Sequence, residues 1–374
     1  MNKTITNFIK MGLVLLVGTT LFGACTKDRG IMVLERLPKE TIGVYTLGEG
    51  AFGAANNSTI TYYDVTASTT TKDFFKKQNG IDLGTNANDL KQYGSKMYCV
   101  VTGTAVAAKD SYVEVINIST GKSVKRIPFY DASKGFLPRH VGFYKGKAYV
   151  SSYDGFVSRI DTAVLNIEAR IAVGGALDGL AVVNNKLYVA NSLTPSFPST
   201  NNASISVVDL TSFTKLKEIA VNTNPTTIAT TASGEIYAIT NGTYTPPFIA
   251  PSLERINATT DTKTQTYNYS LGGIAIDGAQ GLVIVYGDYP APNSLKRLNV
   301  STGATGADFI TDNTAIASLY AITINPLNGD VFVADANNYG TEGKVIAFSS
   351  TGKRKFEFFT GAIPQTVVFN YSYK

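Results

Sequence analysis

The sequence predicts an all-β protein, a seven-bladed β-propeller built from four-stranded antiparallel blades. The first observation behind this prediction is a short strand that recurs along the chain with an aromatic or apolar residue at its centre. The spacings between neighbouring copies run from 39 to 53 residues. Repeats of this length made of alternating apolar strands are typical of propeller blades. The seven centres are Tyr45, Tyr98, Tyr149, Tyr188, Tyr237, Val283 and Phe332.

The second observation is the pattern inside each repeat. In "GLAVVNNKLYVANS" (179–192) an apolar strand, an Asn-Asn turn and a second strand follow one another, and "SISVVDLTSFTKLKEIAV" (204–221) adds a third and a fourth strand. Alternating apolar residues separated by polar turns predict antiparallel hairpins. Most third strands end in an Asp or Asn that we expect to cap the following turn. These residues are Asp64, Asn117, Asp161, Asp209, Asn257 and Asn299.

The third observation concerns the two ends of the repeat region. The segment "IPQTVVFN" (363–370) has the form of a first strand but leaves no room for a second, whereas the first repeat begins at "GVYTLGEG" (43–50) and lacks a first strand. We therefore expect the C-terminal strand to complete the first blade and close the ring, because closure removes an exposed sheet edge. The predicted propeller spans residues 41–374.

The first 40 residues predict export and lipid anchoring. Two lysines precede the apolar run 11–22, which is too short to span a bilayer and is typical of a signal peptide. The segment 21–25, "LFGAC", resembles a bacterial lipobox, which predicts a signal peptide over 1–24, lipid on Cys25 and a tether over 25–40. The following "TKDRG" resembles the export tags of surface lipoproteins. We expect a protein on the outer membrane that faces the cell exterior, with a periplasmic orientation as the alternative.

Composition narrows the kind of site that the chain can build. There are 21 Tyr and 19 Phe but only one histidine, His140, so a site that needs several imidazoles is excluded. The net charge of +5 is spread thinly, and we expect no nucleic-acid partner. Cys99 lies inside an apolar strand and is expected to be a buried, inert thiol.

The predicted topology places two sets of loops on one face of the ring, namely the loops between second and third strands and the links between blades. Nearly all the long loops carry an aromatic residue among Asn, Thr, Gly and Pro. Loops held by a rigid scaffold are common binding sites. The alternative is that these rings only hold their own loops in place. The candidate ligand-binding residues are Phe52, Asn86, Arg139, His140, Tyr153, Asp154, Asp178, Asn191, Phe197, Tyr244, Phe248, Tyr289 and Tyr339.

Catalysis is not indicated by the residues of these loops. The candidate carboxylates are scattered about one per blade, and no spacing singles out an acid–base pair. We therefore expect a binding protein without catalytic residues, catalytic cofactor or metal site. His140 is expected to resist protonation because it adjoins Arg139. The carboxylates considered are Glu49, Asp154, Asp178, Asp288 and Asp335.

The lipobox, the opening "LGEGAFG…ITYYD" (47–64) and the closing "DVFVADANNYGTEGKVIAFSSTGK" (330–353) carry a family resemblance. The chain resembles the BtuG-type vitamin B12-binding surface lipoproteins of gut Bacteroidota, which are YncE-like seven-bladed propellers. The resemblance implies a cobalamin or corrinoid site on one propeller face and a BtuB-like, TonB-dependent outer-membrane transporter as partner. No cobalt ligand is assigned. The alternative is a surface propeller that binds or processes a glycan or lactone and uses a metal if it is an enzyme.

Replacement of the predicted lipid-bearing residue tests the anchoring. We expect Cys25→Ser to leave the chain unlipidated, because the thioether-forming sulfur is lost, and to move the protein from the detergent phase to the aqueous phase on phase partitioning. Unaltered partitioning would refute the assignment.

Overall fold

The computed structural model describes residues 37–374, except 52, 195, 198–199, 289 and 341. The chain divides into two compact units, residues 1–37 with 373–374, and Pro38–Ser372. The predicted signal peptide, Cys25 and most of the predicted tether lie outside the described residues. Among the residues that are described, no helix is long and apolar enough to cross a membrane.

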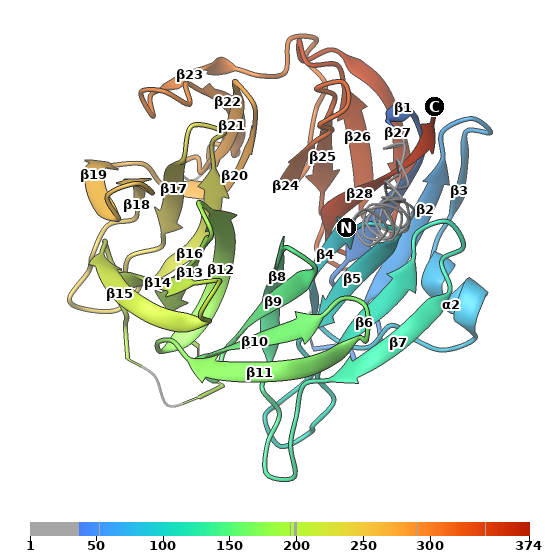
Figure 1. Ribbon diagram of the computed structural model, residues 1–374. Coiled ribbons are helices and arrows are strands. Elements are labelled where there is room, and N and C mark those ends of the chain that lie inside the picture. Colours follow the sequence, from blue (N-terminus) through green and yellow to red (C-terminus); the bar gives the residue numbers. More distant parts are fainter. Residues whose placement is uncertain (1–36, 52, 195, 198–199, 289, 341) are drawn as a thin grey trace, which may run out of the picture. The chain divides into compact units, whose positions relative to one another are not determined.

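The larger unit is a ring of seven four-stranded antiparallel sheets, as the repeats predict (Figure 1). Each sheet is one blade, and its first strand lies innermost. Blade 1 contains β28 (Pro364–Tyr373), β1 (Pro38–Gly48), β2 (Thr59–Asp64) and β3 (Thr69–Thr71); blade 2 contains β4 (Ala87–Tyr93), β5 (Lys96–Val101), β6 (Tyr112–Asn117) and β7 (Ser123–Pro128); blade 3 contains β8 (Pro138–Tyr144), β9 (Lys147–Ser152), β10 (Phe156–Asp161) and β11 (Asn166–Ala172).

The remaining blades follow the same order. Blade 4 contains β12 (Ala176–Val183), β13 (Lys186–Ser192), β14 (Ser204–Asp209) and β15 (Thr214–Ala220); blade 5 contains β16 (Pro225–Thr230), β17 (Glu235–Thr240), β18 (Ser252–Asn257) and β19 (Thr262–Tyr267); blade 6 contains β20 (Leu271–Asp277), β21 (Gln280–Val285), β22 (Ser294–Leu298) and β23 (Thr305–Asp308); blade 7 contains β24 (Leu319–Ile324), β25 (Val331–Asp335), β26 (Lys344–Phe348) and β27 (Arg354–Phe359).

Ring closure occurs as predicted. The C-terminal strand β28 pairs with β1 and supplies the inner strand of blade 1. The first strand begins at Pro38, three residues before the predicted boundary at 41. All six predicted turn caps also form, because the side-chain oxygen of each third-strand Asp or Asn accepts backbone N–H groups two or three residues further on.

The recurring tyrosines of the second strands lie between neighbouring blades. Their side chains are at most 1% exposed in the first five blades. Three of the hydroxyls reach the turn after the third strand of the next blade, where Tyr45 donates to the Ile118 carbonyl at 2.6 Å. Tyr188 and Tyr237 make the same contact with the carbonyls of Ala258 and Val300. In these three blades the tyrosine therefore fills the inter-blade core and its hydroxyl is hydrogen-bonded.

Blade 1 departs from the predicted pattern at its outer edge. Its fourth strand, β3, has only three residues and is followed by a short helix, α2 (Phe74–Asn79). The helix buries Phe75, and the Phe74 ring packs on Tyr45 at 5.8 Å between centroids. Two consecutive aromatic residues do not fit an edge strand with one solvated face, and a helical turn directs both rings toward the blade.

The closing strand offers a test of the ring. Phe369 in β28 is 5% exposed and packs on Phe332 at 4.9 Å between ring centroids. We expect Phe369→Ala to lower the free energy of unfolding by about 3–5 kcal/mol in a urea titration, because it leaves a cavity between the first and last blades. Phe359→Ala is the matched control, since Phe359 is 52% exposed. Equal effects of the two changes would contradict the stabilising role of Phe369 in ring closure.

Candidate functional site

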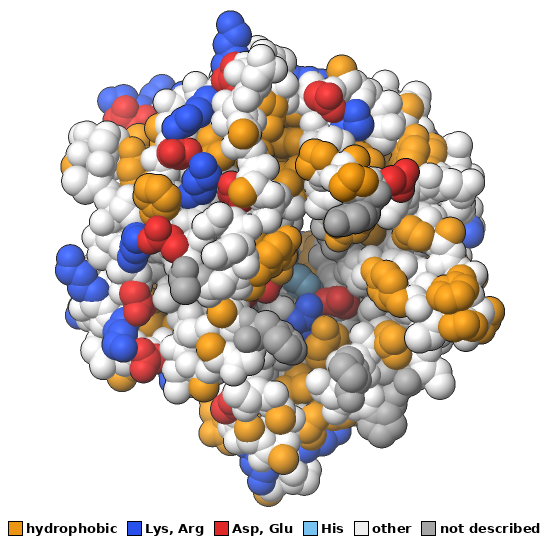
Figure 2. All heavy atoms as spheres, turned by 180° about the vertical axis from the view of Figure 1, so that it is seen from behind, with side chains coloured by type: hydrophobic (Ala, Val, Ile, Leu, Met, Phe, Trp, Pro, Cys, Tyr) orange, Lys and Arg blue, Asp and Glu red, His pale blue; other side chains and the backbone are white. Residues whose placement is uncertain are grey.

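Six of the seven inner strands carry a register shift close to their first residue. Such β-bulges re-aim side chains and are common beside binding sites. At each shift, one or two residues of the inner strand have no single partner on the neighbouring strand. All of these residues line one cavity of about 590 Å³, which we call the central hollow. They are Asn88, Arg139, His140, Asp178, Gly179, Thr226, Thr227, Gly272 and Tyr320. Figure 2 shows the hollow at the centre of one face, with charged and histidine side chains at its floor.

The floor of the central hollow is a compact ionic cluster. The two ring nitrogens of His140 face two carboxylates, with Nε2 at 3.2 Å from Asp178 Oδ1 and Nδ1 at 3.5 Å from Asp89 Oδ2. Arg139 Nε donates to Asp178 Oδ1 at 3.2 Å, and another guanidinium nitrogen donates to the Asn88 side-chain oxygen. The side chains of Asp89 and Asp178 are only 4% and 11% exposed, so these contacts form with little water around them.

His140 differs from its sequence-based expectation. Burial alone would lower its pKa, but hydrogen bonds to Asp178 and Asp89 and attraction to both carboxylates outweigh burial, so the pKa lies above the ordinary 6.5. The prediction that His140 would resist protonation because it adjoins Arg139 has the wrong direction, since the pKa is raised. Arg139 is itself paired with Asp178, which therefore faces both the guanidinium and the imidazole.

The carboxylates of the floor respond to the same contacts. Burial would raise the pKa of Asp89, but Lys91, His140 and the Val141 N–H hold it down to about 2. The pKa of Asp178 is also lowered, because Arg139 and His140 outweigh its burial. Both groups are therefore carboxylates at neutral pH.

One further acid stands beside this cluster. Glu49 follows β1 and accepts a hydrogen bond from the Tyr320 hydroxyl at 2.9 Å. Burial raises its pKa, against the effects of Tyr320, Arg139 and His140.

Aromatic side chains surround the mouth of the hollow. Tyr320 contacts Tyr339 edge to face at 6.0 Å, and both line the hollow together with Tyr286. Burial raises the pKa of Tyr286, and the nearby hydroxyls of Tyr244 and Tyr339 add to this effect. The loops of blades 5, 6 and 7 therefore bring their rings together. On the other side, the Tyr153 ring lies 4.7 Å from the Arg139 guanidinium.

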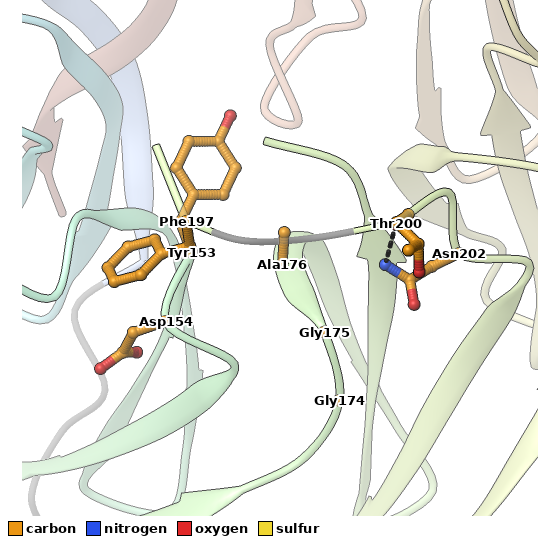
Figure 3. Close-up of a pocket in the computed structure, with 8 residues that line it drawn as sticks. All are labelled: Tyr153, Asp154, Gly174, Gly175, Ala176, Phe197, Thr200 and Asn202. Carbon is orange, nitrogen blue, oxygen red and sulfur yellow. Dashed lines mark hydrogen bonds between the residues drawn. The ribbon is translucent and has the colours of Figure 1, made fainter. Parts of the chain in front are cut away.

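A second cavity of about 710 Å³, which we call the side cavity, lies between the loops of blades 3 and 4. Figure 3 shows the rings of Tyr153 and Phe197 on one side and Thr200 with Asn202 on the other. The backbone of Gly174 and Gly175 forms part of the wall. A Cβ on Gly174 would approach the Asn191 side chain to 1.9 Å, so a residue with a side chain would not fit at this position.

The structure separates the predicted site residues. Arg139, His140, Asp178 and Tyr339 line the central hollow, and Tyr153, Asp154 and Phe197 line the side cavity. Tyr244 and Phe248 stand outside both cavities and are 84% and 73% exposed, so neither ring is packed to hold its own loop. Phe52 and Tyr289 lie outside the described residues.

Two further predicted residues line neither cavity. Asn191 is 1% exposed and donates to the hydroxyls of Ser204 and Ser206 inside blade 4. Asn86 donates to the Gly103 carbonyl at 3.0 Å and is not among the residues that line the hollow.

Other residues of the hollow were missed by the sequence-based prediction. Asn88 and Asp89 belong to the same link as Asn86, two and three residues further on. Tyr286 lies three residues before the predicted residue Tyr289 in the sequence, and Tyr320 lies in the inner strand β24. The signal that could have found Asn88, Asp89 and Tyr320 is a polar residue within the first three residues of an inner strand.

Two of the scattered acids, Asp335 and Asp154, make structural contacts. Asp335 is 1% exposed and accepts hydrogen bonds from the backbone N–H groups of Ala317, Ser318 and Asn337. Asp154 pairs with Arg170 at 2.8 Å. In the part of the chain that the structure describes, no group of three or more His, Cys, Asp or Glu side chains is arranged to hold a metal ion.

The second cysteine also behaves as expected. Cys99 is 0% exposed in β5, and burial raises the pKa of its thiol.

Fold and site together define a seven-bladed propeller whose loop-bearing face opens into a polar hollow with an aromatic rim. The chain belongs to the family described as a domain of unknown function, DUF5074, whose model matches residues 42–361. No curated protein matches the chain.

Solved structures share the fold at low sequence identity. A quinonprotein alcohol dehydrogenase-like protein from Bacteroides thetaiotaomicron is 14% identical, with a TM-score of 0.64 over 88% of this chain and 78% of its own. A lactonase-like propeller from Bacteroides uniformis, assigned as a candidate 6-phosphogluconolactonase, is 11% identical, with a TM-score of 0.62 over 88% of this chain and 100% of its own. Kuenenia stuttgartiensis hydrazine synthase is 14% identical, with a TM-score of 0.54 over 68% and 73%. These likenesses concern the fold alone.

Asp335 provides a test of how the loops of the site are held. We expect Asp335→Ala to lower the free energy of unfolding by about 3 kcal/mol in a urea titration, because buried N–H groups lose their acceptor. Asp288→Ala is the control, since Asp288 is exposed, and it should change stability by no more than about 0.5 kcal/mol. A neutral Asp335→Ala would contradict the positioning role of this carboxylate.

Proposed function

We propose that this protein is a binding protein that captures a large, uncharged ligand, a cobalamin or related corrinoid, on its loop-bearing face. The observation that carries the proposal is the concentration of exposed rings on that face. In the described part of the chain, five of the seven exposed aromatic side chains stand on its loops and links. They are Tyr130, Tyr244, Phe248, Tyr286 and Tyr339. Exposed apolar surface gathered around a hollow is typical of binding sites.

The chemistry of the face suits such a ligand. Cobalamin is a rigid macrocycle fringed with amides, and a rigid ligand loses little conformational freedom on binding. Tyrosine and phenylalanine rings can cover its apolar area. Side-chain amides can both donate to and accept from its amides, and Asn241 and Asn293 line the hollow while Asn202 lines the side cavity.

Delivery and location form part of the same proposal. The resemblance to BtuG-type lipoproteins supports a lipid anchor on Cys25, a position on the outer membrane facing outward, and transfer of the ligand to a BtuB-like, TonB-dependent transporter. No catalytic residue or catalytic cofactor is proposed.

The direct experiment uses the colour of the ligand. Purified protein mixed with cyanocobalamin and desalted should stay red, and titration calorimetry should give a saturable heat. Absence of binding in calorimetry would refute the proposal. Metal-dependent turnover of a lactone or a surface glycan would support the alternative function instead.

The exposed rings can be tested by paired substitution. We expect the double variant Tyr244→Ala/Phe248→Ala to weaken cyanocobalamin binding by about tenfold or more and to leave the melting temperature nearly unchanged, because neither ring packs in the core. The control is Val164→Ala/Leu216→Ala, which removes exposed apolar side chains outside this face. Equal loss of affinity in both double variants would contradict a role of the rim.

A further inference from the structure

The single histidine of the chain joins three successive blades at the floor of the hollow. His140 belongs to the inner strand of blade 3, whereas Asp89 and Asp178 belong to the inner strands of blades 2 and 4. Each ring nitrogen faces one of these carboxylates, at 3.5 Å and 3.2 Å. The backbone is fixed as well, because Ser151 Oγ accepts from the His140 N–H and donates to the Asp178 carbonyl.

This geometry determines the state of the imidazole. A carboxylate only accepts hydrogen bonds, so a ring with a carboxylate at each nitrogen is best satisfied when both nitrogens carry protons. A neutral imidazole would turn one lone pair toward a buried carboxylate, which is repulsive.

We propose that His140 is held as an imidazolium, that it is a positioning residue tying the inner strands of blades 2, 3 and 4 together, and that the floor it fixes receives an uncharged group of the ligand. The first two parts stand on the geometry alone, and the third rests on the proposed function. His140 accordingly has no free lone pair with which to bind cobalt or another metal, and it cannot serve as a general base.

The other charged groups around His140 are also paired. On β4, Lys91 Nζ lies 3.3 Å from Asp89 Oδ2 and donates to the Val141 carbonyl at 2.9 Å. Arg139 is bonded to Asp178 and to Asn88.

From blade 1, Glu49 is bonded to Tyr320. An anionic ligand group would have to break one of these pairs, whereas a primary amide can donate to a carboxylate and accept from the guanidinium without displacing either.

Titration of the histidine tests its protonation. Because the chain has one histidine, its imidazole resonances in a long-range ¹H–¹⁵N spectrum need no assignment by mutation. We expect both nitrogens to be protonated at neutral pH and the ring to titrate above 6.5, its ordinary pKa. A neutral tautomer at neutral pH would overturn the proposal.

The pH dependence of stability has a defined sign. Since the pKa of His140 is raised in the folded protein, the stability that its charge contributes is fully present below 6.5 and is lost as the pH rises through the folded pKa. His140→Gln should abolish this alkaline loss, which a purely steric role would not predict.

A double variant separates charge pairing from shape. His140→Gln alone should lower the melting temperature, because Asp89 is left buried with less compensation. Adding Asp89→Asn should restore part of the loss, since its other partner, Lys91, is 42% exposed and can be solvated. If the losses in melting temperature caused by the two substitutions add, the proposed pairing of His140 with Asp89 is wrong.

Binding tests the third part of the proposal. His140→Gln should weaken cyanocobalamin binding by about tenfold. Of the monocarboxylic acids made by hydrolysing one side-chain amide of cyanocobalamin, at least one should bind about tenfold more weakly than the parent. Equal affinity of all of them would overturn the uncharged-group assignment. If wild-type protein binds no cyanocobalamin, the proposed function fails, while the spectra and melting data still decide the state of His140.

Discussion

The contact on which this ring depends is the packing of one aromatic side chain per blade against the next blade. A blade alone has two apolar faces and cannot bury either. The tyrosine in the middle of a second strand fills the space between two sheets, and in three blades its hydroxyl reaches a carbonyl in the next blade's turn, as Tyr45 does with Ile118. Because each blade is held by its neighbours, the last must meet the first, and β28 provides that contact by entering blade 1.

Closure of the ring also determines where polar side chains can lie near the axis. The inner strands crowd together around the axis, so closely that a Cβ on Gly179 would come within 2.1 Å of the Thr226 carbonyl oxygen of the next blade. Regular strands at this radius would leave little room for polar side chains. The bulges at the starts of the inner strands relieve the crowding and direct extra residues toward the axis at one end. The central hollow and its ionic floor are therefore products of the same packing constraint that closes the ring.

The sequence predicts the closed ring better than it predicts the central hollow. The blade number, the closing strand and the turn caps follow from a period and from residue types, which are visible in the sequence. A bulge has no such signature, and it changes which neighbouring residue faces the axis. That is why Asn86 was chosen where Asn88 and Asp89 line the hollow. The direction of the pKa shift of His140 was mispredicted for a related reason. Its adjacent residue, Arg139, is obvious in the sequence, but its two carboxylate partners come from other blades.

The division of the face into a charged floor and an uncharged rim has a consequence for ligand recognition. The floor groups are bonded to one another across blades 2, 3 and 4, so they are rigid before any ligand arrives. The exposed aromatic side chains of blades 5 to 7 are carried on loops. Those of Tyr244 and Phe248 have little contact with the body of the propeller, because they are largely exposed. A rigid floor favours a ligand of fixed shape with groups that both donate and accept, whereas exposed rings favour flat apolar area. Both requirements are met by the proposed ligand, a large, stiff, amide-bearing molecule, and neither a small charged metabolite nor a purely apolar one would meet both.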